Sequence, residues 1–353
     1  MRLTAESFAI LMAPFAPFES HPVLAVAVSG GRDSLALALL ADQWARARDG
    51  HAVGLIVDHG LRAEAAGEAS ATSDLLARHG IDVEILRWDG EKPAHGLQEA
   101  ARAARYRLLF AACRARGILH LLVAHHADDQ AETVVMRARR GSGPDGLAGM
   151  AALVEWRDAR LLRPLLGVAR AELTTMLTAR GVAWIDDPSN ADPRFERARL
   201  RAAGVVPAAA GEAQTARPAR EAGVARAAVD MLENDGELAL DRDAFARLDP
   251  ATAAALLSRV VQAVGGRDHP PRRDRLARAA ARLSAGDSRG KSGKSGDFTL
   301  AECRLMLRQA PNGGRLRWIV RPENGKGNLG KERQPLVPAA FFACGGLTSP
   351  HVD

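Results

Sequence analysis

The first half of this chain alternates short apolar runs with longer amphipathic segments, and few folds accommodate that pattern. Four runs have the length and composition of buried strands: residues 23–28, 52–57, 81–86 and 118–124. Three segments between them have the apolar spacing of helices: residues 35–48, 64–79 and 97–116. Strands that alternate with helices form parallel sheets covered on both faces. We therefore expect an α/β fold with a doubly wound parallel sheet.

The pattern changes in the second half of the chain. A helix at 126–140, a strand near 160–166 and a helix at 170–180 continue the α/β unit. The following residues are rich in Ala with scattered Pro and Gly, which suits a linker or an imperfect connecting helix. We expect four segments in all: an α/β domain at 1–201, a helical linker at 202–236, a smaller basic domain at 237–321 and a mobile tail at 322–353.

The basic residues are concentrated toward the C-terminus. The full sequence has 48 Lys and Arg against 42 Asp and Glu, a net charge of +6 at pH 7. Residues 267–331 alone hold 16 basic and 6 acidic residues, a local net charge of +10. This distribution is typical of a surface that contacts nucleic-acid phosphates. A solvated face in an Arg-rich chain has the same composition and stays open as an alternative.

Cysteine content and hydropathy argue against several classes of protein. Cys113, Cys303 and Cys344 are far apart and form no CxxC pair, so we expect no disulfide framework, zinc ribbon or iron–sulfur site. No apolar run approaches the roughly 18 residues that a membrane helix needs. Acidic residues and prolines interrupt the first 20 residues, unlike a signal peptide. We expect a cytoplasmic protein without membrane contact.

The strongest local signal is the sequence SGGRDS at residues 29–34, which joins a buried strand to a helix. Its two glycines let the backbone approach a polyphosphate, and the N–H groups at the helix N-terminus favour an anion. Bare phosphate would repel Asp33, so this residue indicates that Mg²⁺ or an amine is bound as well. An ordinary strand–helix turn capped by Asp or Ser is the bland alternative.

Two further groups of polar residues are candidates for a ligand site, which parallel sheets form at the carboxyl ends of their strands. Asp58 and His59 follow the second strand, although a plain loop explains them too. Arg102 and Arg105 are three residues apart on one predicted helix face, beside Glu99. These arginines either clamp phosphate oxygens or form ion pairs within the helix.

A cluster of histidines and acids marks the end of the fourth strand and the first turn of the next helix. Its members are His125, His126, Asp128, Asp129 and Glu132. By ligand type the cluster suits a metal ion. Asp129 and Glu132 also lie at i and i+3 on one helix face, which suits recognition of an ammonium group equally well.

Two patterns that resemble nucleotide-binding motifs are rejected. GSGPDG at 141–146 matches GxGxxG, but it follows a predicted helix and contains Pro144, so we interpret it as a loop and expect no NAD site. AGDSRGKS at 285–292 matches a loose phosphate-loop pattern, but no apolar strand precedes it and its surroundings are of low complexity.

SGGRDS after a first strand resembles the PP-loop of ATP pyrophosphatases, which cleave ATP between the α and β phosphates. Further motifs occur in the order seen in tRNA(Ile)-lysidine synthetases: VDHGLR (57–62), QEAARAARY (98–106), AHHADDQAET (124–133), RRGSGPDGLAGM (139–150), RPLL (163–166) and DDPSN (186–190). This resemblance covers residues 20–205 well and the rest loosely. Arg197, Arg199 and Arg201 match an RNRIR-like pattern of the family, whereas Ala198 replaces its usual Asn. Surface charge is the alternative explanation of these arginines.

The resemblance implies a fold of the PP-loop ATP pyrophosphatase type and a ligase. Such an enzyme joins L-lysine to C2 of the wobble cytidine of a minor isoleucine tRNA, through an adenylated cytidine, and releases AMP and pyrophosphate. ATP and Mg²⁺ are the implied cofactors, the basic domain is the implied tRNA-binding part, and the family often forms homodimers.

The resemblance also implies roles for individual residues. The ATP-binding residues would be Ser29, Gly30, Gly31, Arg32, Asp33, Ser34, Asp58 and His59, with Asp33 also at Mg²⁺. Lysine would bind Asp129, Glu132 and Arg197. The catalytic residues would be Asp33, Arg105 and Asp129.

Two other functions stay open at this point. A tRNA thiolase of the PP-loop class also adenylates a nucleobase, but it needs a sulfur carrier, and three isolated cysteines offer no paired thiols. A nonenzymatic tRNA-binding protein with a vestigial nucleotide site would account for the basic stretch. It would not explain why the complete SGGRDS loop and the two acids at 129 and 132 occur together.

Overall fold

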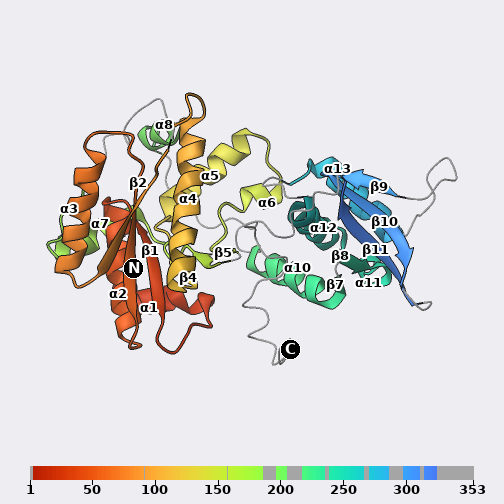
Figure 1. Ribbon diagram of the computed structural model, residues 1–353, viewed down its shortest axis with the longest axis horizontal. Coiled ribbons are helices and arrows are strands. Elements are labelled where there is room, and N and C mark those ends of the chain that lie inside the picture. Colours follow the sequence, from red (N-terminus) through yellow and green to blue (C-terminus); the bar gives the residue numbers. More distant parts are fainter. Residues whose placement is uncertain are drawn as a thin grey trace. The chain divides into compact units, whose positions relative to one another are not determined.

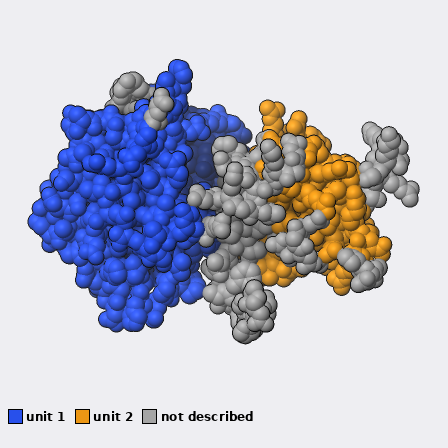
Figure 2. Space-filling model, viewed as in Figure 1, with its two compact units in different colours: residues 1–215 blue, residues 216–353 orange. Residues whose placement is uncertain are grey.

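The chain folds into two compact units, Met1–Thr215 and Ala216–Asp353 (Figure 2). The computed structural model describes most of both units: residues 3–90, 92–156, 158–185, 196–204, 217–234, 238–265, 270–285, 297–310 and 314–323. The DDPSN motif, nearly all of AGDSRGKS and the expected tail beyond residue 323 lie outside these ranges. Within the described ranges, no helix is both long and apolar enough to cross a membrane.

Unit 1 is built on a six-stranded sheet in the order β3-β2-β1-β4-β6-β5 (Figure 1). The strands are β1 (Val23–Val28), β2 (His51–Asp58), β3 (Asp82–Arg87), β4 (His120–Leu122), β5 (Leu153–Glu155) and β6 (Arg160–Leu162). All neighbouring strands are parallel except β5 and β6, which are antiparallel. The expected α/β fold with a doubly wound parallel sheet is confirmed, and β5 is an edge strand that the apolar pattern did not predict.

Helices cover both faces of this sheet, which explains why β1 is apolar throughout. Leu24, Val26 and Val28 face one core with side chains from α1, α2, α3 and α7. Ala25 and Ala27 face the other core with side chains from α4. The helices of unit 1 are α1 (Ala5–Met12), α2 (Arg32–Arg46), α3 (Ala65–Arg78), α4 (Leu97–Arg116), α5 (Ala127–Arg139), α6 (Pro144–Leu147), α7 (Arg170–Ala179) and α8 (Glu196–Ala202), with a 3-10 turn, η1 (Ala13–Phe15).

Unit 2 is a five-stranded antiparallel sheet in the order β7-β8-β11-β10-β9, with helices packed on one face. Its elements are α10 (Arg217–Met231), β7 (Leu232–Asn234), β8 (Leu238–Asp241), α11 (Arg242–Ala246), α12 (Pro250–Gly265), α13 (Arg273–Ala285), β9 (Phe298–Leu300), β10 (Cys303–Gln309) and β11 (Leu316–Pro322). Trp318 is fully buried in its core.

The expected linker at 202–236 is corrected in one respect. Residues 217–231 form α10, whose Val224, Ala227, Ala228 and Met231 are buried in the core of unit 2. These four residues follow helical spacing, but two of them are alanines, whose small apolar surface gives a weak periodic signal. The helix therefore belongs to unit 2.

Arg160 ties the N-terminal segment to the amino edge of the sheet. Its buried guanidinium donates to the carbonyl oxygens of Phe15 at 3.0 Å and Pro17 at 2.8 Å. It also donates to Nδ1 of His120 at 3.2 Å, and Nε2 of His120 lies 2.8 Å from a carboxylate oxygen of Glu19. Buried carbonyls need donors, so this one side chain organises the chain before β1.

Replacing Arg160 by Met should lower the free energy of unfolding of unit 1 by about 3 kcal/mol, because the buried carbonyl of Phe15 and the partly buried carbonyl of Pro17 lose their donor. Arg114→Met is the matched control. Arg114 is 54% exposed and 3.5 Å from Asp158, so its loss should cost less than about 1 kcal/mol. Urea denaturation followed by circular dichroism measures both variants. Equal losses of unfolding free energy in the two variants would show that Arg160 does not hold the N-terminal segment in place.

Candidate active site

Residues 29–34, between β1 and α2, form a loop that is closed by its own hydrogen bonds. The hydroxyl of Ser34 donates to the carbonyl of Gly31 at 2.9 Å and accepts from the amide of Ser29 at 3.1 Å. Gly30 adopts a positive φ of 79°, and its carbonyl accepts from the amide of Ile185 at 3.0 Å. Gly31, at the N-cap of α2, has no side chain to cap the helix, so the first N–H groups of α2 suit an anion.

Asp33, in the first turn of α2, is surrounded by cationic groups. Its carboxylate lies 3.2 Å from Nε of Arg32, 3.4 Å from Nε2 of His126 and 4.0 Å from Nε of Arg170. Burial alone would raise the pKa of this carboxyl. The hydrogen bond and charge of His126, with the two arginines, outweigh burial and lower the pKa of Asp33 below its usual value.

His126, at the N-cap of α5, is the centre of this cluster. The ring is 2% exposed, with Nδ1 3.4 Å from Asp128 and Nε2 3.5 Å from Asp129. Burial alone would lower the pKa of His126, but Asp33, Asp129 and Asp128 outweigh it and raise that pKa. Asp128 also accepts from the amide of Arg170 at 2.9 Å, so it caps α7. One imidazole therefore joins the first turns of α2, α5 and α7.

The two acids of α5 adjoin this cluster. Asp129 is 8% exposed and Glu132 is 1% exposed, and both lie on the buried face of the helix. The short helix α8 brings Arg197 to them: its NH1 is 3.9 Å from Asp129 Oδ1, and its NH2 donates to the hydroxyl of Thr133 at 3.5 Å. The structure therefore brings Asp33 and Asp129 to His126, and Arg197 to Asp129, although these residues are far apart in the sequence.

Arg105 extends from α4 and is half-buried. Burial, assisted by repulsion from Arg102, lowers the pKa of its guanidinium. Burial and repulsion from Arg105 also lower the pKa of His59. Arg102 lies over the ring of Tyr106 at 5.0 Å. The oxygens of Asp58 accept from the amide of Gly60 at 2.9 Å and approach Arg87 at 4.0 Å, contacts that belong to the turn after β2.

Two arginines of this site were not singled out in the sequence. Arg170 approaches Asp33, and Arg163 donates from Nε to Nδ1 of His125 at 3.3 Å. Arg163 belongs to the RPLL stretch and Arg170 begins α7. Position in the chain gives no sign that either side chain turns toward the ends of β1 and β4.

The arrangement favours a cluster of acids paired with His126 over a dedicated metal centre. Among the described residues, no group of three or more His, Cys, Asp and Glu side chains could hold a metal ion. Both ring nitrogens of His126 face carboxylates instead. Asp33 offers a partly exposed carboxylate beside the loop, which fits Mg²⁺ that arrives on a polyphosphate, since Mg²⁺ commonly takes one or two carboxylates plus phosphate oxygens.

The GSGPDG stretch follows α5 and contains the single helical turn α6, so our loop interpretation missed one short turn. The stretch after it is held against α5. Gln130 bonds both the amide and the carbonyl of Met150, at 2.7 and 3.1 Å, and Arg137 donates to the carbonyl of Gly149 at 2.6 Å. No strand leads into it, as a dinucleotide-binding fingerprint requires.

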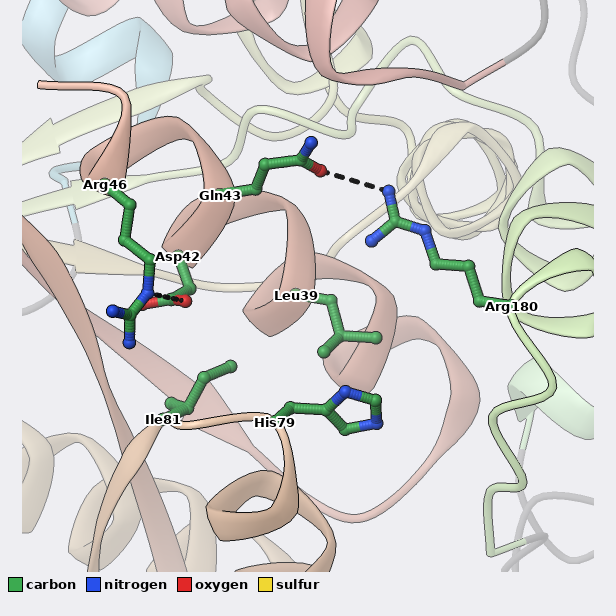
Figure 3. A pocket seen from close by; sticks show the side chains of 7 residues that line it. All are labelled: Leu39, Asp42, Gln43, Arg46, His79, Ile81 and Arg180. Carbon is green, nitrogen blue, oxygen red and sulfur yellow. Dashed lines mark hydrogen bonds and ion pairs between the residues drawn. The ribbon is translucent and has the colours of Figure 1, made fainter.

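A hollow of about 420 Å³ lies near the far end of α2 from the 29–34 loop (Figure 3). Four of its polar side chains form two pairs: Asp42 with Arg46 at 2.6 Å and Gln43 with Arg180 at 3.1 Å. Asp42 also accepts from the amide of Ala52 at 3.1 Å. These contacts anchor the C-terminal half of α2 to its neighbours, which is a structural role.

Comparison with known proteins gives consistent matches. A family described as the PP-loop domain matches residues 4–208. The chain is 44% identical over 277 residues to the tRNA(Ile)-lysidine synthase of Bradyrhizobium sp. (strain BTAi1), covering 71% of this chain and 76% of that protein. It is 40% identical over 299 residues to that of Hyphomonas neptunium, covering 80% and 78%.

Similarity to solved structures is weaker. A U34-tRNA thiolase from Methanococcus maripaludis, solved with its 4Fe–4S cluster, aligns with a TM-score of 0.47 and 16% identity. The alignment covers 56% of this chain and 71% of that one. A likeness of this size does not bear on activity.

The loop geometry predicts different outcomes for its two glycines. A Cβ at Gly30 would sit 2.5 Å from the hydroxyl of Thr72 and would need the positive φ, so Gly30→Ala should destabilise unit 1 by about 2 kcal/mol. A Cβ at Gly31 meets nothing nearer than 3.6 Å, so Gly31→Ala should cost less than about 1 kcal/mol. Thermal unfolding compares the two. A larger loss at Gly31 would contradict this geometry.

Proposed function

Because this chain belongs to the tRNA(Ile)-lysidine synthase family, we propose that it ligates L-lysine to C2 of the wobble cytidine of a minor isoleucine tRNA. ATP activates the cytidine as an adenylate, and AMP and pyrophosphate are released. One observation carries the proposal beyond family membership. The 29–34 loop, suited to polyphosphate, adjoins the Asp129 and Glu132 acids, suited to an ammonium group, through His126.

In the first step, cytosine O2 attacks the α-phosphorus of ATP and pyrophosphate leaves. The uncapped N–H groups of α2 and the exposed Ser29 would hold the departing phosphates, and Arg105 would neutralise charge on the phosphoryl group. The hydroxyl of Ser34 already bonds Gly31, so Ser34 would contribute by shaping the loop. Mg²⁺, bound through Asp33, would supply further charge neutralisation.

In the second step, the ε-amine of lysine attacks C2 and AMP leaves. The carboxylates of Asp129 and Glu132 would bind the ε-ammonium group of lysine and orient it. A protonated amine has no lone pair, so a carboxylate must also accept its proton before attack. Arg197, 3.9 Å from Asp129, would bind the carboxylate end of lysine.

The two cysteines in the described part of the chain do not support thiolase chemistry. Burial raises the pKa of Cys113 in α4 to about 12, so its thiolate is scarce at neutral pH. Cys303 is also buried and donates to the carbonyl of Val261 at 3.3 Å. Neither described thiol has the exposure that a sulfur carrier needs, which leaves lysine ligation as the favoured activity.

The proposal is tested by incubation of the protein with labelled lysine, ATP and total tRNA. We expect label in lysidine after digestion to nucleosides, and a loss of at least about a hundredfold in Asp33→Asn, which removes the charge beside the loop. Arg46→Gln, remote from the loop, should keep full activity. If the unaltered protein incorporates no label into any nucleoside, the proposal is refuted. If Asp33→Asn keeps the activity of the unaltered protein, the role of Asp33 is refuted.

We further propose that unit 2 binds tRNA through the sheet face opposite its helices. Alternation places Arg304 and Arg308 of β10 on this face, paired in register with Arg321 and Arg317 of β11. Like charges directly opposite each other destabilise a sheet. Asp297 compensates in part, at 3.0 Å from Arg304 and 3.1 Å from Arg308. A phosphate backbone would bind this row of arginines.

We also propose that the protein forms a homodimer, as members of the family often do, and that it acts in the cytoplasm, where tRNA is modified.

The proposed tRNA-binding face of unit 2 predicts a selective loss. The double variant Arg304→Gln/Arg321→Gln should raise the KM for tRNA about tenfold and leave the KM for ATP unchanged, because each lost phosphate contact weakens binding severalfold. The control double variant, Arg226→Gln/Arg247→Gln, changes two exposed arginines outside the sheet. Equal effects of the two double variants on steady-state kinetics would sink this assignment.

A further inference from the structure

His125 is a polar residue of the site to which the proposed steps assign no role. It follows β4, and Arg163 follows the neighbouring parallel strand β6, so both lie at the carboxyl edge of the sheet. Arg163 is 8% exposed and its NH1 donates to the carbonyl of Ala151 at 2.7 Å. Its Nε donates to Nδ1 of His125 at 3.3 Å.

This contact defines the protonation of the ring. A guanidinium has donors and no acceptor, so Nδ1 of His125 must be the acceptor and carry no proton. The proton of the neutral ring is then on Nε2, which becomes a hydrogen-bond donor. The second bond of Arg163, to Ala151, keeps the guanidinium from turning away.

The surroundings of His125 keep the ring neutral. Burial and repulsion from Arg163, Arg105, Arg197 and Arg102 hold its pKa well below the usual value. These arginines come from the end of β6, from α4 and from α8, so positive groups face His125 from three elements. The nearest acids on its own segment, Asp128 and Asp129, contact His126. A neutral hydrogen-bond donor near four arginines suits an anionic ligand.

We propose that Arg163 is a positioning residue that holds His125 as an Nε2–H donor to the α-phosphoryl group of ATP and of the adenylated cytidine. This inference rests on the proposed function. The α-phosphoryl group is present in both steps, and His125 experiences the field of Arg105 from the proposed nucleotide site and of Arg197 from the proposed lysine site. His125 transfers no proton; it donates a hydrogen bond that strengthens as charge develops on the phosphoryl oxygens.

The test is a double-mutant cycle with a pH readout. Arg163→Met should lower kcat for lysidine formation about tenfold to a hundredfold at pH 8, with little change in the KM for lysine, because the ring is no longer held in the orientation and tautomer that donate to the phosphoryl group. In an His125→Ala background the same substitution should change kcat less than threefold. Arg163→Lys, which can still donate to Nδ1, should recover most of the activity.

The pH dependence separates positioning from a structural role. Without Arg163 the pKa of His125 should rise toward its usual value, and below that pKa both ring nitrogens carry protons. The ratio of Arg163→Met to wild-type kcat should therefore rise as the pH falls from 8 to 6. A ratio that stays flat, or additive losses in the cycle, would overturn the inference.

The tautomer is measured directly by ¹⁵N NMR of His125 in the full chain. An Nε2–H ring in the wild type that becomes mixed in Arg163→Met supports the positioning role, and an Nδ1–H ring in the wild type overturns it. Failure of the wild type to form lysidine refutes the proposed function instead, so the two failures are distinguishable.

Discussion

The active-site end of unit 1 depends on one buried imidazole. His126 lies within 3.5 Å of carboxylates from Asp33, Asp128 and Asp129, which belong to the first turns of α2 and α5. Three carboxylates that meet at one buried imidazole repel one another, and a cation there compensates for this repulsion. The raised pKa of His126 shows that they favour its protonated form. The phosphate loop and the acids of α5 therefore share a single electrostatic centre.

The charges around this centre divide into two kinds. Acids from α2 and α5 surround His126, whereas arginines from α4, α8 and the end of β6 surround His125. Adjacent residues of one loop thus lie in opposite electrostatic environments. A cationic amine and an anionic phosphoryl group can be bound side by side under these conditions, as the ligation proposed here requires.

Prediction from the sequence succeeded where the signal was local. The strand at 23–28 and the helix at 97–116 have the bounds that were expected, because a run buried on both faces and a long helix ended by Gly117 are both strong patterns. The edge strand β5 was missed because three residues, paired on one side only, carry little periodic signal. Helix α10 was expected as part of a helical linker and not of unit 2, because alanines weaken the apolar stripe that it buries.

The sequence by itself determined the alternation of strands and helices from residue 23 to residue 140, the position of the 29–34 loop and the acids of α5, because helical and strand periodicities and short motifs are properties of neighbouring residues. Only the tertiary structure decided that Arg163 reaches His125, that Arg170 and His126 enclose Asp33, and that Arg197 reaches Asp129. Such contacts join residues tens of positions apart. Their geometry follows from strand order and helix packing, which bring the ends of β1, β4 and β6 to one edge of the sheet.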